Sequence, residues 1–210
     1  MNSPQKKPFN VLDKAKSESM SDKDFEVFNR VEKRVARTAS AKMKVFMAQF
    51  RTEASGMSFI ELFQEKHSSK QLGIHLRIDK QPRPGARWEA HHIVSGDHKE
   101  AIPSREILAD DEFKIRIDDS DNGCWMPKTK ADARPTIYPN AIGHNRIHRQ
   151  RYYDWIYRVM EPMETEGQVR AFLNTVRAQL LQGNIKPEMK LQQEIDEAEY
   201  NDWLKKNRIL

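Results

Sequence analysis

The first third of the chain has a helical hydrophobic pattern between residues 28 and 50. An apolar side chain recurs there every three or four positions, which places these side chains on one face of a helix. They are Phe28, Val31, Val35, Ala39, Met43, Phe46 and Phe50. Ser21 is a suitable N-cap, and Gly56 is expected to end this region. Ser58 and Glu61 have the spacing of a capping box, which predicts a shorter second helix.

The middle of the chain changes to short strands and turns. Two prolines and a glycine predict a loop and a boundary at residues 80–86. Strands are expected at 87–94 and 124–126, a helix at 103–113, a turn at 118–123 and a polar loop at 128–140.

The last third is again helical in pattern. One helix is expected from residue 142 or 143 to Met160. A second amphipathic face follows, at Val169, Phe172, Leu173, Val176 and Leu180. Gly183 is suited to end that helix. Pro187 can begin a last helix, which is rich in acidic residues.

Composition narrows the class of protein. The chain has 210 residues, of which 32% are charged and 38% hydrophobic, so one core with helical additions is expected. No apolar run approaches the ~18 residues of a membrane span. Residues 1–20 are polar without an apolar core, so they predict a flexible leader and no signal peptide. Cys124 is the sole cysteine, which rules out an internal disulfide and fits a reducing compartment.

The net charge of +5 and pI of about 9.2 favour a polyanionic partner. Ordinary surface chemistry explains a charge of this size equally well. Basic residues gather in the first helical segment, where the acids are Glu26 and Glu32. They are Arg30, Lys33, Arg34, Arg37, Lys42, Lys44 and Arg51. This basic stripe can extend a nucleic-acid surface, or the acidic last helix can cover it.

Five of the seven histidines lie within one 58-residue span: His91, His92, His98, His144 and His148. His144 and His148 are spaced i, i+4 in a predicted helix, so both imidazoles can reach one ion. Such a pair alone is more often a surface or packing feature. Neighbours in a strand point to opposite sides, but at a strand-to-loop junction His91 and His92 can flank one site.

Other candidates are set aside. Cys124 as a fourth ligand would close the site to substrate, so packing in the core is preferred. His98 is expected to be solvated in a loop. The acidic segment 118–123 lacks calcium-loop spacing and is assigned to the turn that presents Asn122.

Three segments occur in order: Trp88-Glu89-Ala90-His91-His92-Ile93-Val94, Asn122-Gly123-Cys124-Trp125-Met126-Pro127 and Gly143-His144-Asn145-Arg146-Ile147-His148. Together they resemble the AHH nucleases of the HNH/endonuclease VII superfamily over about residues 86–160. The resemblance implies a mainly helical α+β fold with a small ββα-metal core flanked by N- and C-terminal helices. The resulting division is a leader at 1–20, a helical region at 21–80, the nuclease core at 81–162 and C-terminal helices at 163–210.

The resemblance also implies roles for residues. His91, His144 and His148 match metal ligands, His92 matches the general base, and Asn122 matches the residue that ties the connecting loop and holds the base. A neutral imidazole with a pKa near ~6.5 suits a base, provided that it is not coordinated. Three protein ligands leave positions open for substrate.

Three imidazoles suit one divalent transition ion. We expect Zn²⁺ at rest, with Mg²⁺, Mn²⁺ or Ni²⁺ as candidates for activity. Arg149 and Arg151 follow the last histidine and are candidates to contact phosphates. A solvated helix face is the alternative for them.

The sequence thus predicts a metal-dependent endonuclease that cleaves DNA with little sequence specificity. Resemblance to bacterial toxin nuclease domains implies an antibacterial effector with an acidic immunity protein as partner and no membrane partner. Such a protein would be cytoplasmic, or exported by a specialised secretion system. Two alternatives stay open: a non-catalytic, metal-stabilised module that binds nucleic acid, and an RNase on the same scaffold.

Overall fold

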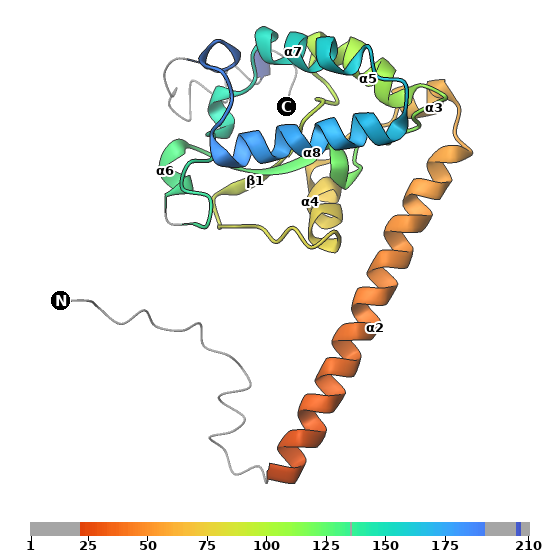
Figure 1. The fold of residues 1–210 in the computed structure, drawn as a ribbon, viewed down its shortest axis with the longest axis vertical. Coiled ribbons are helices and arrows are strands. Elements are labelled where there is room, and N and C mark those ends of the chain that lie inside the picture. Colours follow the sequence, from red (N-terminus) through yellow and green to blue (C-terminus); the bar gives the residue numbers. More distant parts are fainter. Residues whose placement is uncertain (1–21, 135, 192–204, 207–210) are drawn as a thin grey trace, which may run out of the picture. The chain divides into compact units, whose positions relative to one another are not determined.

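The structure is a computed structural model that describes residues 22–134, 136–191 and 205–206 (Figure 1). The predicted leader and most of the acidic last helix lie outside the described residues. The chain divides into two compact units, Met1–Val45 and Phe46–Leu210. Each unit is described by itself.

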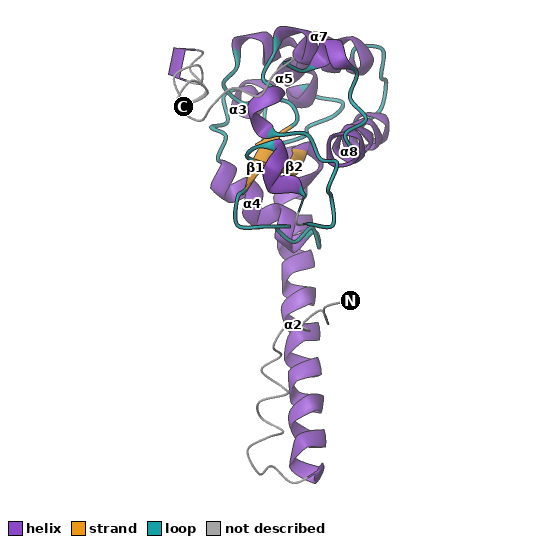
Figure 2. Ribbon diagram, turned by 90° about the vertical axis from the view of Figure 1, so that its left-hand side faces the viewer, coloured by secondary structure: helices purple, strands orange, loops and turns teal. Residues whose placement is uncertain are grey.

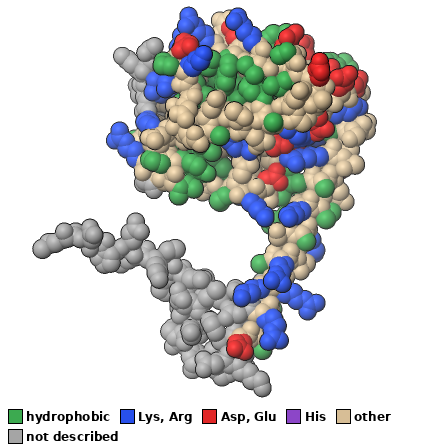
Figure 3. Space-filling view, in the orientation of Figure 1, with side chains coloured by type: hydrophobic (Ala, Val, Ile, Leu, Met, Phe, Trp, Pro, Cys, Tyr) green, Lys and Arg blue, Asp and Glu red, His purple; other side chains and the backbone are tan. Residues whose placement is uncertain are grey.

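One long helix, α2 (Asp22–Ser55), begins in the first unit and ends in the second. It confirms the predicted helix and its end before Gly56. In the first unit the helix presents many Lys and Arg side chains (Figure 3). The apolar residues Val31, Val35 and Met43 are also exposed there. In the second unit the apolar face of the helix ends at Phe50, which is buried.

The second unit contains a two-stranded antiparallel sheet. Strand β1 (Trp88–His92) pairs with β2 (Gly123–Pro127), and the register places His91 opposite Cys124 and His92 opposite Gly123. Helix α4 (Ser69–Ile78) packs against both strands and α8 (Glu166–Gln182) packs against β2 (Figure 2). A Cβ on Gly123 would lie 2.6 Å from Leu72 Cδ1, so any larger residue here would force the buried Leu72 side chain of α4 to shift.

Short helices and 3₁₀ turns complete the second unit. They are α3 (Phe59–Phe63), η1 (Lys99–Ala101), α5 (Ile102–Ala109), η2 (Ser120–Asn122), α6 (Lys130–Ala133), η3 (His144–Arg146), α7 (Gln150–Met160) and η4 (Pro187–Met189). Helices α5 and α7 pack side by side (Figure 1). The predicted capping box of Ser58 with Glu61 is confirmed. The predicted face of α8 is largely confirmed by the burial of its Val and Leu positions, and Gly183 ends that helix at φ 78°.

The helix predicted from residue 142 or 143 to Met160 is wrong in its first half. The chain forms the turn η3, and α7 starts only at Gln150 because Arg149 is extended (φ −148°, ψ 142°). This break lets Ile147 face the core while the new helix buries Tyr152 and Tyr153. His148 therefore lies between two helical segments rather than inside one helix.

Three further differences concern short segments. The helix predicted at 103–113 ends at Ala109, since Asp110 is extended (ψ 143°) and Phe113 packs separately in the core. The loop predicted at 128–140 contains α6, which Thr129 and Asp132 stabilise through a capping box. No helix was predicted at the position of α4.

A buried ion network fixes the turn that precedes β2. The Asp119 side chain is 1% exposed, and its carboxylate accepts from Arg51 (3.0 and 2.9 Å) and from Arg170 Nη1 (2.9 Å). Burial alone would raise the pKa of Asp119. The hydrogen bond from Arg51 and the charges of both arginines outweigh burial, so that pKa lies below its ordinary value.

We expect Asp119→Asn to destabilise the protein by about 3 kcal/mol at neutral pH, near the lower end for a broken buried ion pair because Arg51 is partly exposed. A carboxyl whose pKa is lowered by folding stabilises the protein above its unfolded pKa and loses that effect as pH falls through the folded pKa. The difference from wild type should therefore shrink in acid. Urea unfolding at neutral and acidic pH measures both effects. Asp111→Asn, at a side chain that is 75% exposed, is the control. Equal stability of Asp119→Asn and wild type at neutral pH would contradict this account.

Candidate metal centre and catalytic site

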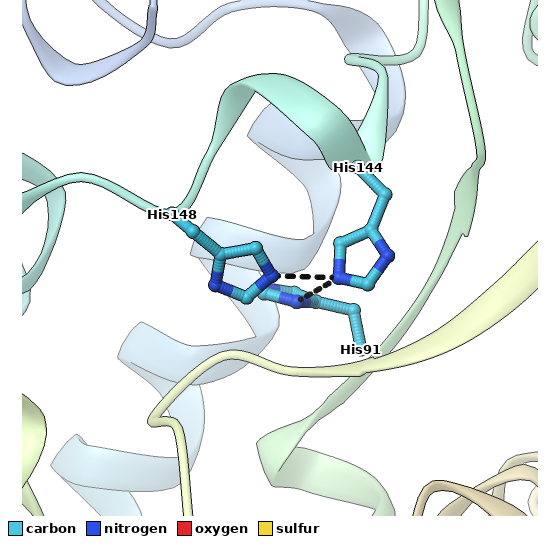
Figure 4. Close-up of side chains that lie close together, drawn as sticks. All are labelled: His91, His144 and His148. Carbon is cyan, nitrogen blue, oxygen red and sulfur yellow. Dashed lines mark hydrogen bonds between the residues drawn. The ribbon is translucent and has the colours of Figure 1, made fainter. Parts of the chain in front are cut away.

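Three histidine side chains from separate segments converge in the second unit (Figure 4). His91 comes from β1, His144 from η3, and His148 from the segment before α7. His144 Nε2 lies 3.1 Å from His91 Nδ1 and 2.9 Å from His148 Nε2. The sequence placed these three residues together, and the structure brings them within metal-binding distance although no continuous helix carries His144 and His148.

The protonation of this cluster fits a bound cation. His144 Nδ1 lies 2.8 Å from Glu89 Oε2, and a carboxylate only accepts, so Nδ1 carries the hydrogen and Nε2 carries a lone pair. Without a cation, that single lone pair would face two neighbouring ring nitrogens. Three lone pairs directed at one divalent ion would remove this conflict.

Burial keeps two of these imidazoles in the form that binds metal. It lowers the pKa of His91 and of His148 well below the ordinary value, and the close neighbour His144 lowers both further. Both rings are therefore neutral near pH 7. A neutral imidazole is the ligating form.

Glu89 belongs to the site, although sequence reasoning did not select it. It stands two residues before His91, and residues two apart share a face of a strand, so this spacing was the signal that could have found it. The hydrogen bond from His144 holds the pKa of Glu89 below its usual range. A carboxylate that fixes the tautomer of a ligand histidine increases its basicity. On the far side of the cluster, the Tyr153 hydroxyl lies 2.7 Å from His148 Nδ1.

We expect Glu89→Gln to weaken metal affinity by about 10–100-fold, the usual cost of losing such a partner. Glutamine keeps the size of the side chain but removes the charge that holds His144. Competition of the protein with a metal-sensitive dye gives the affinity. Glu106→Gln, at an exposed position on α5, serves as the matched control. Unchanged affinity in Glu89→Gln would show that Glu89 does not position the ligand.

His92 faces a different partner from His91. Its side chain is 6% exposed, and its Nε2 lies 2.7 Å from Asp118 Oδ1. The Ser68 amide donates to both Asp118 oxygens, at 2.9 and 3.1 Å. Since the carboxylate accepts, His92 Nε2 carries the hydrogen and Nδ1 keeps a lone pair. Burial lowers the pKa of His92 although Asp118 opposes that effect.

Asp118 was missed because its segment was assigned only to the turn that presents Asn122. It lies 26 residues from His92, and the pairing of β1 with β2 brings the two together. His67 was also missed, and its ring stands edge-on to His92 at 5.1 Å between centroids. No spacing rule in the sequence marks either contact.

Asn122 ties together the two segments that flank the sheet. Its Nδ2 donates to the carbonyls of Val94 (3.1 Å) and Ile117 (2.9 Å), and its Oδ1 accepts from the Val94 amide (2.8 Å). These bonds fix the chain just after His92 and just before Asp118. Asn122 thereby fixes the backbone on either side of the His92–Asp118 pair.

The remaining candidates lie elsewhere. Cys124 is buried in the core as predicted, and burial raises its pKa to about 12, so it stays a thiol. The prediction that His98 is solvated is wrong. His98 is 4% exposed, because its ring stacks on Tyr153 and its Nδ1 caps η1. Arg149 donates to the Lys190 carbonyl (2.8 Å), and Arg151 is exposed at the start of α7.

One pocket of about 610 Å³ joins the histidines. The candidate ligands His91, His144 and His148 line it together with His92. Its other walls come from α4, the loop after α4 and the two strands. Among the described helices, none is long and apolar enough to cross a membrane.

A two-stranded antiparallel sheet with adjacent histidines, and a later segment that supplies two more, form a candidate metal centre on a mainly helical α+β scaffold. A family model matches residues 74–181, just over half of the chain. The chain belongs to the AHH family, a nuclease family of the HNH/ENDO VII superfamily with conserved AHH, here Ala90-His91-His92. Searches among curated proteins and among solved structures gave no match.

Proposed function

We propose that this nuclease is a metal-dependent endonuclease that hydrolyses phosphodiester bonds of DNA with little sequence preference. The observation that carries the proposal is the position of His92. It is neutral and paired with Asp118, and it lines the same pocket as three convergent histidines without being one of them. The pocket therefore offers a candidate proton acceptor, His92, that is distinct from the candidate cation site.

In this mechanism His92 Nδ1 takes a proton from the attacking water. Asp118 holds the ring in that tautomer and stabilises the imidazolium that forms, as a buried carboxylate does for a catalytic histidine elsewhere. The water oxygen bonds to phosphorus, the bond from phosphorus to the 3′ oxygen breaks, and that oxygen takes up a proton from solvent. The products carry a 5′-phosphate and a 3′-hydroxyl. A divalent cation held by His91, His144 and His148 would supply positive charge that stabilises the phosphate and the leaving oxygen.

The donor set supports a transition ion. Three imidazole nitrogens with a carboxylate behind one of them favour Zn²⁺ at rest, whereas Mg²⁺ prefers oxygen ligands. We propose Zn²⁺ as the resting ion, with Mg²⁺, Mn²⁺ and Ni²⁺ as candidates for turnover.

We further propose a role as an antibacterial effector. The basis for this role is the resemblance of the histidine segments to bacterial toxin nuclease domains, and the net charge of +5 is the basis for an acidic immunity protein as partner.

Purified protein incubated with supercoiled plasmid tests the enzymatic proposal. Nicking should require a divalent ion, stop in chelator and return when metal is restored. A parallel RNA substrate decides between DNase and RNase. Binding of nucleic acid without cleavage in any of the divalent ions would instead support a metal-stabilised binding module.

A further inference from the structure

A second set of side chains lines the same pocket without taking part in the chemistry above. Helix α4 buries Leu72 and Leu76 against the sheet. Its positions Lys70, Ile74 and Arg77 are exposed and line the pocket. We call these three residues the α4 wall. Their spacing of four and three residues places them on one helix face.

Two guanidinium groups, one of them from this wall, lie over the indole ring of Trp125. Arg77 and Arg83 lie over the Trp125 ring, at 5.5 and 5.7 Å from its centroid. Arg83 is held in place by the carbonyls of Trp88 (2.6 Å) and Ala86 (2.7 Å). Planar cations fixed on an aromatic ring are suited to stack on bases and to bind phosphate oxygens.

The charge of the pocket points to an anionic ligand. Lys70, Arg77, Arg83 and Lys128 are all lining residues. Glu89 is the one acid among the described lining residues, and it is bonded to His144. Neither Lys70 nor Arg77 has an acidic partner within 4.0 Å among the described side chains. The wall therefore presents positive charge and a small apolar surface beside the candidate catalytic groups.

We propose that the α4 wall, with Arg83 and Trp125, forms the binding surface for the polynucleotide strand. Lys70, Arg77 and Arg83 contact backbone phosphates next to the phosphate at the histidine cluster, and Ile74 packs against a sugar or base. Cleavage of the bound strand at the histidine cluster rests on the proposed function, whereas binding of the strand to the α4 wall does not. The ligand chemistry is a phosphodiester backbone, which DNA and RNA share.

The test measures binding in chelator, where cleavage is blocked. Fluorescence anisotropy follows a labelled oligonucleotide of about 16 nucleotides, as single-stranded DNA, as RNA and as duplex DNA. The double variant Lys70→Gln/Arg77→Gln is compared with Lys99→Gln/Arg158→Gln. The control removes the same charge from exposed residues that do not line the pocket.

We expect the α4 double variant to bind about tenfold more weakly, with a salt slope reduced by about 1 for each lost contact. The control pair should bind like wild type. The preferred strand identifies which form of nucleic acid the wall takes.

Three outcomes would overturn the proposal: equal binding by both double variants, no binding by wild type, or equal affinity for polyglutamate with the same loss in the α4 variant. Plasmid nicking is scored separately. If wild type nicks plasmid but the α4 double variant binds as tightly as wild type, only the α4 wall is refuted. If the α4 double variant binds more weakly but wild type does not nick plasmid, only the nuclease mechanism is refuted.

Discussion

Replacing His92 with alanine is expected to lower plasmid nicking by about 10²–10⁴-fold, the range for a lost general base. In the proposed mechanism the side chain supplies the proton acceptor, and it does not belong to the three-histidine cluster. Metal content should therefore stay at the wild-type level. Initial rates on supercoiled plasmid, with metal measured by elemental analysis on the same samples, check both parts.

The loss must be separated from unfolding, because His92 is buried and bonded to Asp118. His92→Asn keeps a polar side chain beside Asp118 and should be equally inactive while its melting temperature stays near that of wild type. Asp118→Asn should lower the rate at least tenfold, since an amide can donate to His92 Nε2 and so favour the wrong tautomer. Retained nicking in both His92 variants would end the assignment of His92 as base.

Much of the site could be predicted because its signals are local. The doublet His91-His92, the turn at Asn122 and the pair His144 and His148 can each be recognised within a few residues. The order of these segments along the chain is what resembles the AHH nucleases. The strands were predicted for the same reason, since short apolar runs and flanking turns are properties of short segments.

Helix α4 could not be predicted, because its sequence carries two patterns at once. Apolar residues at Leu72, Ile74, Leu76 and Ile78 alternate, and alternation is typical of a strand. In the structure Leu72 and Leu76 form the buried helical face, while Ile74 is 38% exposed. Packing against β1 and β2 favours the helix, and packing is a tertiary property, although the Ser68 N-cap was a local helix signal that the prediction did not use.

The break before α7 and the partners of the histidines depend on the same kind of information. Nothing between His144 and Gln150 is a proline or glycine, so the sequence contains no strong stop signal. The backbone becomes extended at Arg149, and this break allows both Ile147 and Tyr152 to be buried in the core. Asp118 reaches His92, and Glu89 reaches His144, only once the sheet and this turn have formed.

Removing one ligand should abolish both metal binding and activity. We expect zinc to stabilise the wild type by about 2.7 kcal/mol when free zinc is about 100 times the dissociation constant, and we expect His148→Gln to lose this stabilisation. Two histidines bind a divalent ion far more weakly than three convergent nitrogens do, and the ring lost here is one of the two nearest to His144 Nε2.

Thermal unfolding with and without zinc, together with plasmid nicking, measures this loss. His92→Ala is the matched control, because it should keep the full zinc-dependent shift while losing nicking. The two variants thus separate the cation site from the base. A zinc-dependent shift in His148→Gln as large as in wild type would place the metal elsewhere, and the role of His91 and His144 as ligands would fall with it.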